Sequence, residues 1–373
     1  MAYSYKFHAD HIGSLIRPQS LLEARRRVEA GMIEPEELHE VENEEIGKVV
    51  RMQKDAGLDL FTDGEFRRDD FRSGFVDAVD GFTSEIVEMP WQSPEGKVMI
   101  PSTQYWVNER LRQRRRIAEG EVEYLRSLTK TGHIKVTLIS PGFLAERSWR
   151  EGVTDKVYES REELGAEIAE ITRKEIEALF AEGAMYVQLD NPGYSAFVGS
   201  HVRLDGNGGS DAQAGFERTL AADIAAVEGV ERPDGASIGM HICRGNRSSM
   251  WLAEGGYDAI AERVFSSLPV DRFLLEFDDE RAGGFEPLRH VPDDKVVVLG
   301  LISTKTSQLE SVEALVRRID EAASIVEIDN LAVSPQCGFA SVADGANKLS
   351  ADDEFKKLRL VYDTAIAAWG FEG

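Results

Sequence analysis

The stretch SREELGAEIAEITRKEIEALFAEGAMYVQLDNP at residues 160–192 contains both repeating elements of the fold. Its first part, Ser160–Glu182, starts with a Ser-x-x-Glu sequence typical of a helix N-terminus and carries apolar residues at helical spacing. Its last part contains the short apolar run Tyr186–Leu189, which is typical of a strand. The stretch therefore predicts a long helix followed directly by a strand.

Short apolar or β-branched runs of the same kind recur along the chain, and helical patterns lie between most of them. The eight runs are Phe7–Ile12, Leu60–Thr62, Ile134–Ile139, Tyr186–Leu189, Ser237–Ile242, Phe273–Phe277, Lys295–Leu301 and Asn330–Ser334. Further helices are expected at Pro18–Ala30, Glu37–Ala56, Ser307–Val326 and Asp352–Trp369. Eight strands alternating with helices predict an α/β fold, the (β/α)8 TIM barrel. The main alternative is a doubly wound open sheet, but the chain has no glycine-rich phosphate turn of the dinucleotide type.

A length of 373 residues fits one barrel with insertions. We therefore expect residues 1–373 to form a single catalytic domain. Residues from about 80 to 123 fit no simple strand–helix unit, so we expect an insertion there, after the second strand. A hairpin and a helix that cover the mouth of the barrel would account for it.

The formal net charge of −24 makes nucleic acid and anionic membranes unfavourable partners, because phosphate groups repel such a surface. The one dense basic run, Arg110–Arg116, is interpreted as a solvated helix face. No apolar run is long enough to span a bilayer, and the N-terminus does not resemble a secretory signal, so a cytoplasmic location is expected. In that reducing compartment the only two cysteines, Cys243 and Cys337, are not expected to form a disulfide.

Polar side chains follow nearly every predicted strand. In a TIM barrel the carboxyl ends of all strands lie on one face, where catalytic groups are found, so these segments are expected to converge. They are His11-Ile12-Gly13-Ser14, Asp63-Gly64-Glu65, Gln188-Leu189-Asp190, His241-Ile242-Cys243, Glu276, Ser303-Thr304-Lys305 and Pro335-Gln336-Cys337-Gly338.

The pair His241 and Cys243 is the sharpest of these features, because residues two apart on a strand point the same way. Cys337 and Glu276 lie at the ends of two other strands. One imidazole, two thiols and one carboxylate form a tetrahedral ligand set that suits zinc. The alternatives are two inert core thiols or a structural zinc site. Structural sites are usually built from local, thiol-rich knuckles, and this set comes from distant strands, which favours a catalytic site.

A zinc ion held by two thiolates and a carboxylate has a net negative charge and is poorly suited to generating hydroxide. It suits the binding and deprotonation of a substrate thiol, which is mostly protonated at pH 7 when free. Glu65 and Asp190 could hold an ammonium group nearby, and Ser14 could hold a carboxylate. Together these residues describe a pocket for an α-amino acid. Each acid taken alone could equally be a helix cap or a surface ion pair.

These residues resemble the catalytic barrel of the cobalamin-independent methionine synthase family, whose motifs appear in the same order from about Ile12 to Gly338. The resemblance implies zinc on His241, Cys243, Glu276 and Cys337. It implies homocysteine held by Ser14, Glu65, Asp190 and the carbonyl of Ile12. It also implies a barrel of the kind shared with uroporphyrinogen decarboxylase, and a methyl donor such as a methylated folate or a corrinoid protein as second partner.

Three departures from that family concern the donor and the chemistry. Full-length members carry a second, N-terminal barrel that helps to bind folate, and this chain has only the catalytic barrel. Plant and enterobacterial members have Asp-Glu-Pro where this chain has Asp190-Asn191-Pro192. They also carry a proton-donating histidine where this chain has Lys305. Lys305 and Asp190 are the candidate catalytic residues, and Lys305 could equally be a surface residue.

The sequence thus predicts a zinc-dependent methyltransferase that converts homocysteine to methionine. One alternative is zinc-dependent alkyl transfer to another thiol such as coenzyme M, although its sulfonate would favour a cationic pocket over Glu65 and Asp190. Another is a metal-free decarboxylase of the uroporphyrinogen type, and a third is an inactive barrel that serves as a scaffold. A homo-oligomer is compatible with the sequence, which does not define the oligomeric state.

Overall fold

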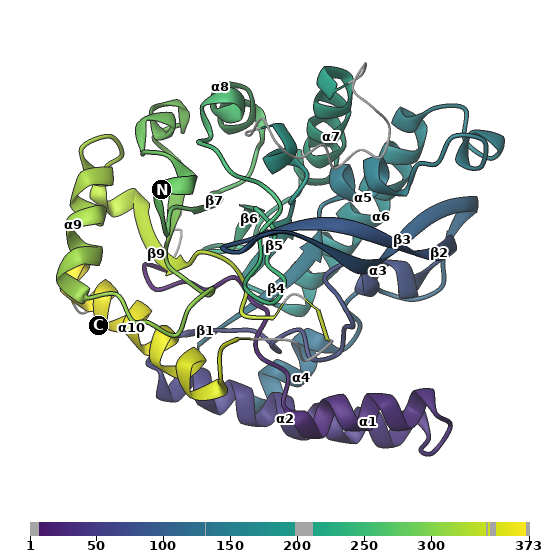
Figure 1. Cartoon of the computed structure of the whole chain (residues 1–373), viewed down its shortest axis with the longest axis horizontal. Helices are drawn as coiled ribbons and strands as arrows, with labels where there is room; N and C mark the ends of the chain where they lie inside the picture. The colour runs from purple at the N-terminus through teal and green to yellow at the C-terminus, as the bar shows by residue number, and fades with distance from the viewer. Residues whose placement is uncertain (1–6, 131, 198–211, 341, 344–347, 371–373) are drawn as a thin grey trace.

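Seven parallel strands form the central sheet of the computed structural model, and helices surround it (Figure 1). The structure describes residues 7–130, 132–197, 212–340, 342–343 and 348–370. The strands are ordered β1-β4-β5-β6-β7-β8-β9, so neighbours in the sheet follow one another along the chain. A doubly wound sheet would reverse its strand order, and this alternative is therefore excluded. The bounds are β1 (Leu60–Phe61), β4 (His133–Ile139), β5 (Tyr186–Asp190), β6 (Ser237–Ile242), β7 (Arg272–Glu276), β8 (Val296–Ile302) and β9 (Leu331–Pro335).

The segment Phe7–Ile12 takes the place of the eighth strand, between β9 and β1. Ala9 forms a single parallel bridge with Val333, flanked by hydrogen bonds from Asp10 N to Val333 O and from Val333 N to His8 O. On the other side, a ring nitrogen of His11 lies 3.1 Å from the carbonyl oxygen of Leu60. The predicted TIM barrel is thus confirmed. The predicted first strand forms no regular ladder: it has one bridge with backbone hydrogen bonds to β9 and one side-chain contact to β1.

The helices lie outside the sheet and end close to the predicted positions. Their bounds are α1 (Gln19–Glu29), α2 (Pro35–Asp55), α3 (Ser73–Ala78), α4 (Glu121–Leu128), α5 (Pro141–Ser148), α6 (Arg161–Glu182), α7 (Ala212–Val227), α8 (Asp258–Ser267), α9 (Val312–Ala323) and α10 (Ala351–Trp369). Short 3-10 helices cover Thr154–Lys156, Tyr194–Phe197, Glu280–Ala282, Glu286–His290 and Ile328–Asn330. Among the described residues, no helix is both long and apolar enough to cross a membrane.

Helix α6 begins and ends at residues whose local geometry explains its bounds. The hydroxyl of Ser160 accepts a hydrogen bond from the backbone N–H of Glu163, as an N-cap does. The carboxylate of Glu163 accepts from Glu159 N, one residue before the cap, so the reciprocal capping box is not formed. Gly183 ends the helix with a φ of 95°, in the left-handed region that favours glycine.

Helix α9 begins later than the predicted Ser307, because the residues before it are used in a loop. Ser311 caps the helix, accepting a hydrogen bond from Ala314 N. Glu310 instead accepts from Ser303 N and pairs with the buried amine of Lys357 in α10. These contacts tie the loop that follows β8 to the outer helix layer.

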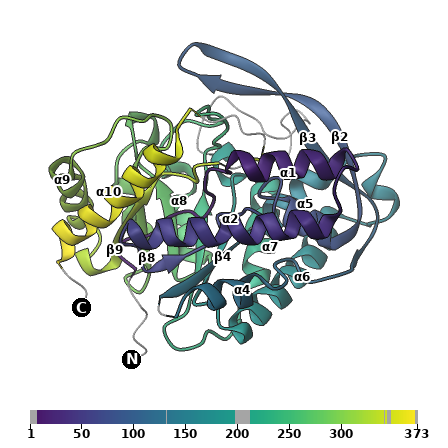
Figure 2. The same ribbon diagram turned by 90° about the horizontal axis from the view of Figure 1, so that it is seen from below.

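The insertion after β1 contains a long antiparallel hairpin, β2 (Val79–Ser93) and β3 (Gly96–Gln113), which extends beyond the barrel (Figure 2). It follows the second predicted strand, as expected. The basic run Arg110–Arg116 lies on β3 and the loop after it, so the interpretation as a helix face was wrong. Arg116 is not merely solvated either, because it pairs with the fully buried carboxylate of Glu175 in α6.

Helices α5 and α7 pack against each other through a glycine. A β-carbon on Gly142 would lie 2.2 Å from the backbone oxygen of Thr219, closer than any real contact. We expect Gly142→Ala to lower the free energy of unfolding by about 1–3 kcal/mol, because a backbone atom cannot move aside as a flexible side chain can. Chemical denaturation followed by circular dichroism would measure the change.

The matched control is Gly165→Ala in α6, where the nearest atom to the new β-carbon is 3.5 Å away, on Ala222. That contact is ordinary, so this change should be neutral or should stabilise the protein by up to about 1 kcal/mol through reduced backbone entropy. Equal effects of the two substitutions would show that the close approach at Gly142 is not what limits the packing.

Candidate active site

The four predicted metal ligands converge at the carboxyl ends of three strands. His241 lies on β6 and Cys243 directly follows that strand, Glu276 ends β7, and Cys337 follows β9. All four side chains are buried, and their ligand atoms lie within 4.8 Å of one another. The two sulfur atoms are 3.4 Å apart, and both thiols are free. The barrel thus brings together residues separated by almost one hundred positions in the chain.

The histidine presents one ring nitrogen to this cluster. Nδ1 of His241 lies 2.9 Å from Oδ1 of Asp190, while the buried Nε2 has no hydrogen-bond partner among the described residues. A carboxylate on the far nitrogen of a histidine is the usual arrangement around a metal-binding imidazole. Glu276 is fixed as well, since one of its carboxylate oxygens accepts a hydrogen bond of 2.7 Å from Arg244 N. The donor set therefore fits a four-coordinate divalent cation such as zinc.

The surroundings of two of these ligands, Cys243 and His241, raise their pKa values. The hydrogen bond with Cys337 and then burial raise the pKa of Cys243 well above its usual value. Burial alone would lower the pKa of His241, but the hydrogen bond and charge of Asp190 outweigh it and raise the pKa to about 9. A bound divalent cation favours the deprotonated forms, because its charge replaces the protons.

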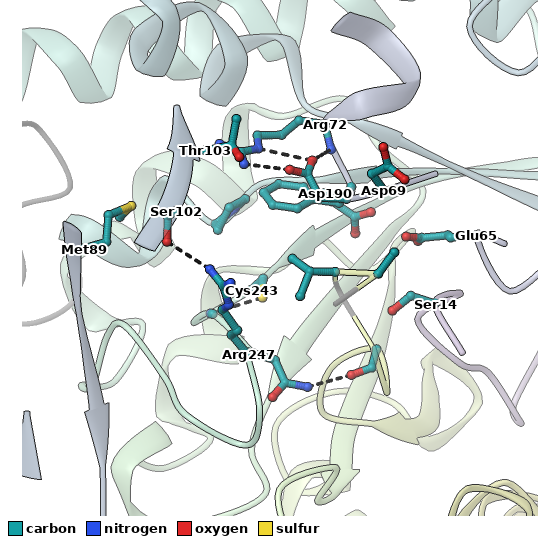
Figure 3. A pocket seen from close by; sticks show the side chains of 18 of the residues that line it. Ser14, Glu65, Asp69, Arg72, Met89, Ser102, Thr103, Asp190, Cys243 and Arg247 are labelled. Atoms are coloured by element: carbon teal, nitrogen blue, oxygen red, sulfur yellow. Dashed lines mark hydrogen bonds and ion pairs between the residues drawn. The ribbon is translucent and has the colours of Figure 1, made fainter. Parts of the chain in front are cut away.

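The predicted substrate residues line the same cavity as three of the ligands, as Figure 3 shows for Ser14, Glu65, Asp190 and Cys243. The cavity has a volume of about 570 Å³, and Ile12, His241 and Cys337 also lie on its wall. Such a volume accommodates a small amino acid together with part of a second molecule. Three of the predicted metal ligands and all the predicted substrate-binding residues therefore face the same cavity.

Glu65 is held in a strained turn. Its φ is 61°, one of few positive values for a residue other than glycine, and its N–H donates to Oδ1 of Asp63 at 2.7 Å. The guanidinium of Arg17 donates to the carbonyl oxygen of Glu65 at 2.9 Å. Such conformations persist where surrounding contacts enforce them, and they cluster at functional sites.

Gln188 is a site residue that the sequence analysis quoted but did not assign. Its side-chain amide donates hydrogen bonds of 2.8 Å to both the carbonyl oxygen of Ile12 and Oδ1 of Asp190. The spacing was the available signal, because Gln188 and Asp190 are two apart on β5 and point the same way. Gln188 thus fixes two of the predicted substrate-binding groups relative to each other.

Asn191, the departure from the family's Asp-Glu-Pro, belongs to a buried polar network with Asp223 of α7. Its amide donates to Oδ2 of Asp223 at 2.7 Å and to Ser140 at 2.8 Å. Asp223 also accepts from the hydroxyl of Tyr194 at 2.9 Å. Such satisfied networks rigidify a structure, and this one anchors the chain immediately after Asp190.

Gly338 allows the close approach of the last barrel segment to Ser14. A β-carbon at this position would lie 1.9 Å from the hydroxyl oxygen of Ser14. The backbone N–H of Phe339 donates to the carbonyl oxygen of Ser14 at 2.9 Å. A side chain on the residue after Cys337 would therefore clash with Ser14. Glycine at this position lets a metal ligand and a predicted substrate-binding residue lie close together.

Lys305 lies apart from these groups. Its amine is buried without a hydrogen-bond partner among the described residues, and it is not one of the residues on the wall of the cavity. Its charge acts on Asp278, close to Glu276. Burial, followed by the charge of Glu276, raises the pKa of Asp278 to about 6, and Lys305 opposes this rise.

The hairpin forms the outer wall of the cavity, as expected for an insertion that covers the mouth. Met89, Ser102 and Thr103 face it in Figure 3, and Trp91 and Tyr105 line it as well. The guanidinium of Arg247, in the loop after Cys243, donates to Ser102 at 3.0 Å. An isolated antiparallel β-bridge between Gln92 and Trp251 also joins the hairpin to that loop.

The sequence profile of the cobalamin-independent synthase catalytic domain matches residues 7–352. The chain belongs to the cobalamin-independent methionine synthase family. It is 39% identical to the uncharacterized protein YxjH of Bacillus subtilis, over 97% of this chain and 95% of that protein. It is 27% identical to a methionine synthase of Saccharolobus islandicus, over 88% of this chain and 86% of that protein.

The fold agrees with that of a B12-independent methionine synthase from a Shewanella species, with a TM-score of 0.75 at 20% sequence identity. That comparison covers 97% of this chain and 98% of the other. Family membership makes the protein a methyltransferase of the methionine synthase type, and the resemblance inferred from the motifs is confirmed.

Proposed function

We propose that the protein transfers a methyl group to the thiol of L-homocysteine, with zinc held by His241, Cys243, Glu276 and Cys337. The observation that carries this proposal is that the four ligand atoms lie within 4.8 Å of one another, and that three of the ligands line the same cavity as Glu65 and Asp190. When bound, zinc supplies the positive charge that keeps the substrate thiol deprotonated and nucleophilic at neutral pH.

The protein's own residues orient the amino acid. The two carboxylates, Glu65 and Asp190, face the ammonium group, and the hydroxyl of Ser14 donates to the carboxylate. The carbonyl oxygen of Ile12 already accepts one hydrogen bond from Gln188 and has a second lone pair for the ammonium group. Asp190 has a double task, because its Oδ1 orients His241 while its other oxygen is available to the substrate.

The methyl donor would enter from the side of the hairpin, where aromatic side chains and arginines line the cavity. A methylated folate and a corrinoid are the two donor classes proposed. After the methyl group passes to sulfur, a folate donor would keep the electron pair of the broken bond on nitrogen and require a proton there, whereas a corrinoid would keep that pair on cobalt and require none. We propose Lys305 as the source of the proton for a folate donor, delivered through water because the amine of Lys305 does not line the cavity. A reducing compartment such as the cytoplasm suits the two free thiols.

The test is the metal content of the purified protein, followed by zinc-edge X-ray absorption with and without L-homocysteine. We expect about one zinc per chain, and an oxygen or nitrogen ligand replaced by sulfur when L-homocysteine is added. Zinc without such a change would contradict homocysteine as the substrate. Protein that stays free of zinc after growth in zinc-replete medium would contradict the assignment of the metal.

A further inference from the structure

The two carboxylate oxygens of Glu65 have different surroundings. Oε1 accepts a hydrogen bond of 2.9 Å from the hydroxyl of Thr137, on strand β4. Oε2 is buried and has no hydrogen-bond partner among the described residues. Because Glu65 lies on the wall of the cavity, Oε2 is the oxygen left for a ligand.

The direction of the hydrogen bond from Thr137 is set by a second residue, Arg68. Nη1 of Arg68 lies 2.9 Å from the hydroxyl oxygen of Thr137. A guanidinium can only donate, so the hydroxyl accepts from Arg68 and its own proton points to Glu65. Both Thr137 and Arg68 are buried, at 2% and 7% exposure, and water therefore has little opportunity to replace either bond.

The charge of Arg68 acts on both Glu121 and Glu65. Burial raises the pKa of Glu65, and the nearby guanidinium of Arg68 is the strongest opposing influence. The other acid next to Arg68 is Glu121, 3.3 Å from Nη2. Burial, and then the charge of Asp63, raise the pKa of Glu121 to about 8, and Arg68 opposes this rise.

We propose that Thr137 and Arg68 are positioning residues that hold Glu65 with its free oxygen toward the ammonium group of the substrate. This inference rests on the proposed function, and it adds two residues that touch neither the thiol nor the metal ligands. The hydroxyl of Thr137 orients the carboxylate, and the charge of Arg68 opposes its protonation. The pair would therefore select thiols that carry an amino group.

The test compares Thr137→Val with the wild-type protein, using zinc-loaded enzyme and isothermal titration calorimetry. The two ligands are L-homocysteine and 4-mercaptobutanoate, which lacks only the amino group. We expect the affinity for L-homocysteine to fall about 10- to 100-fold, as for the loss of a hydrogen bond to a charged group. The affinity for 4-mercaptobutanoate should change less than about twofold, because Glu65 has no ammonium to bind there.

Thr137→Ser keeps the hydroxyl and should restore most of the affinity for L-homocysteine. Thr172→Val is the matched control, because this buried threonine of α6 only donates back to Ile168 O, at 2.9 Å. Equal losses for both ligands, or an unchanged affinity for L-homocysteine in Thr137→Val, would overturn the positioning role. If the wild-type protein bound neither ligand, the proposed function itself would fail, which is a distinguishable result.

Discussion

Replacing either cysteine of the metal cluster by serine is expected to remove zinc and methyl transfer together. Cys243 and Cys337 are buried 3.4 Å apart, and each supplies one of the four ligand atoms. A serine hydroxyl keeps its proton at neutral pH and is shorter than a thiol, so it replaces neither the charge nor the reach of the thiolate. The zinc content should fall from about one per chain to near zero.

The rate of methionine formation should fall by more than about 100-fold, since loss of a mere outer-shell partner already costs 10- to 100-fold. Zinc would be measured by elemental analysis and activity with a methylated donor, on proteins shown to be folded by circular dichroism. The control is His39→Gln, which changes an exposed histidine of α2. A cysteine variant that retained both zinc and activity would rule out the proposed ligand set.

Replacing Asp10 by asparagine is expected to cause a large loss of stability. Asp10 is fully buried, with one oxygen 2.8 Å from Nζ of Lys135 and the other 3.6 Å from Nη1 of Arg272. Both cations are themselves buried, and the amine of Lys135 also donates to His11 O at 2.6 Å. The change removes the negative charge that faces two buried cations, so the free energy of unfolding should fall by about 3–5 kcal/mol.

The loss in free energy of unfolding caused by Asp10→Asn should become smaller as the pH approaches the usual pKa of lysine. Burial lowers the pKa of Lys135, and Asp10 opposes this, so removing Asp10 lowers it further. A base with a lowered pKa in the folded state binds more protons when unfolded, and stability therefore rises with pH. Urea denaturation at several pH values would measure both effects.

The control for this prediction is Asp363→Asn, which breaks an exposed pair with Arg359 on α10. Its effect should stay below about 0.5 kcal/mol, as for most surface ion pairs. A loss smaller than about 1 kcal/mol in Asp10→Asn would mean that the cluster does not depend on Asp10. The substitution should also disturb the active site, because Asp10 and Lys135 fix the segment that carries Ile12 and Ser14.

Most of the barrel could be predicted because strands and helices depend on local patterns. The spacing of apolar residues placed α6 and α10 within about one residue of their observed bounds. Where a pattern was weak, tertiary contacts decided the outcome. The residues before Val312 join a loop through Glu310, and the first part of the basic run lies on a strand because β3 pairs with β2 along the hairpin.

The residue pattern alone was sufficient to predict the class of fold and most of the residues at the mouth of the barrel, since the order of strands dictates which side chains share one face. The orientation of those side chains depends on the packed barrel and could not be predicted from the pattern. That Asp190 bonds to Nδ1 of His241, and that Thr137 and Arg68 hold Glu65, depends on rotamers and distances between residues far apart in the chain. Such contacts leave no periodic signal, because each is formed only when the packed barrel brings one particular pair of side chains together.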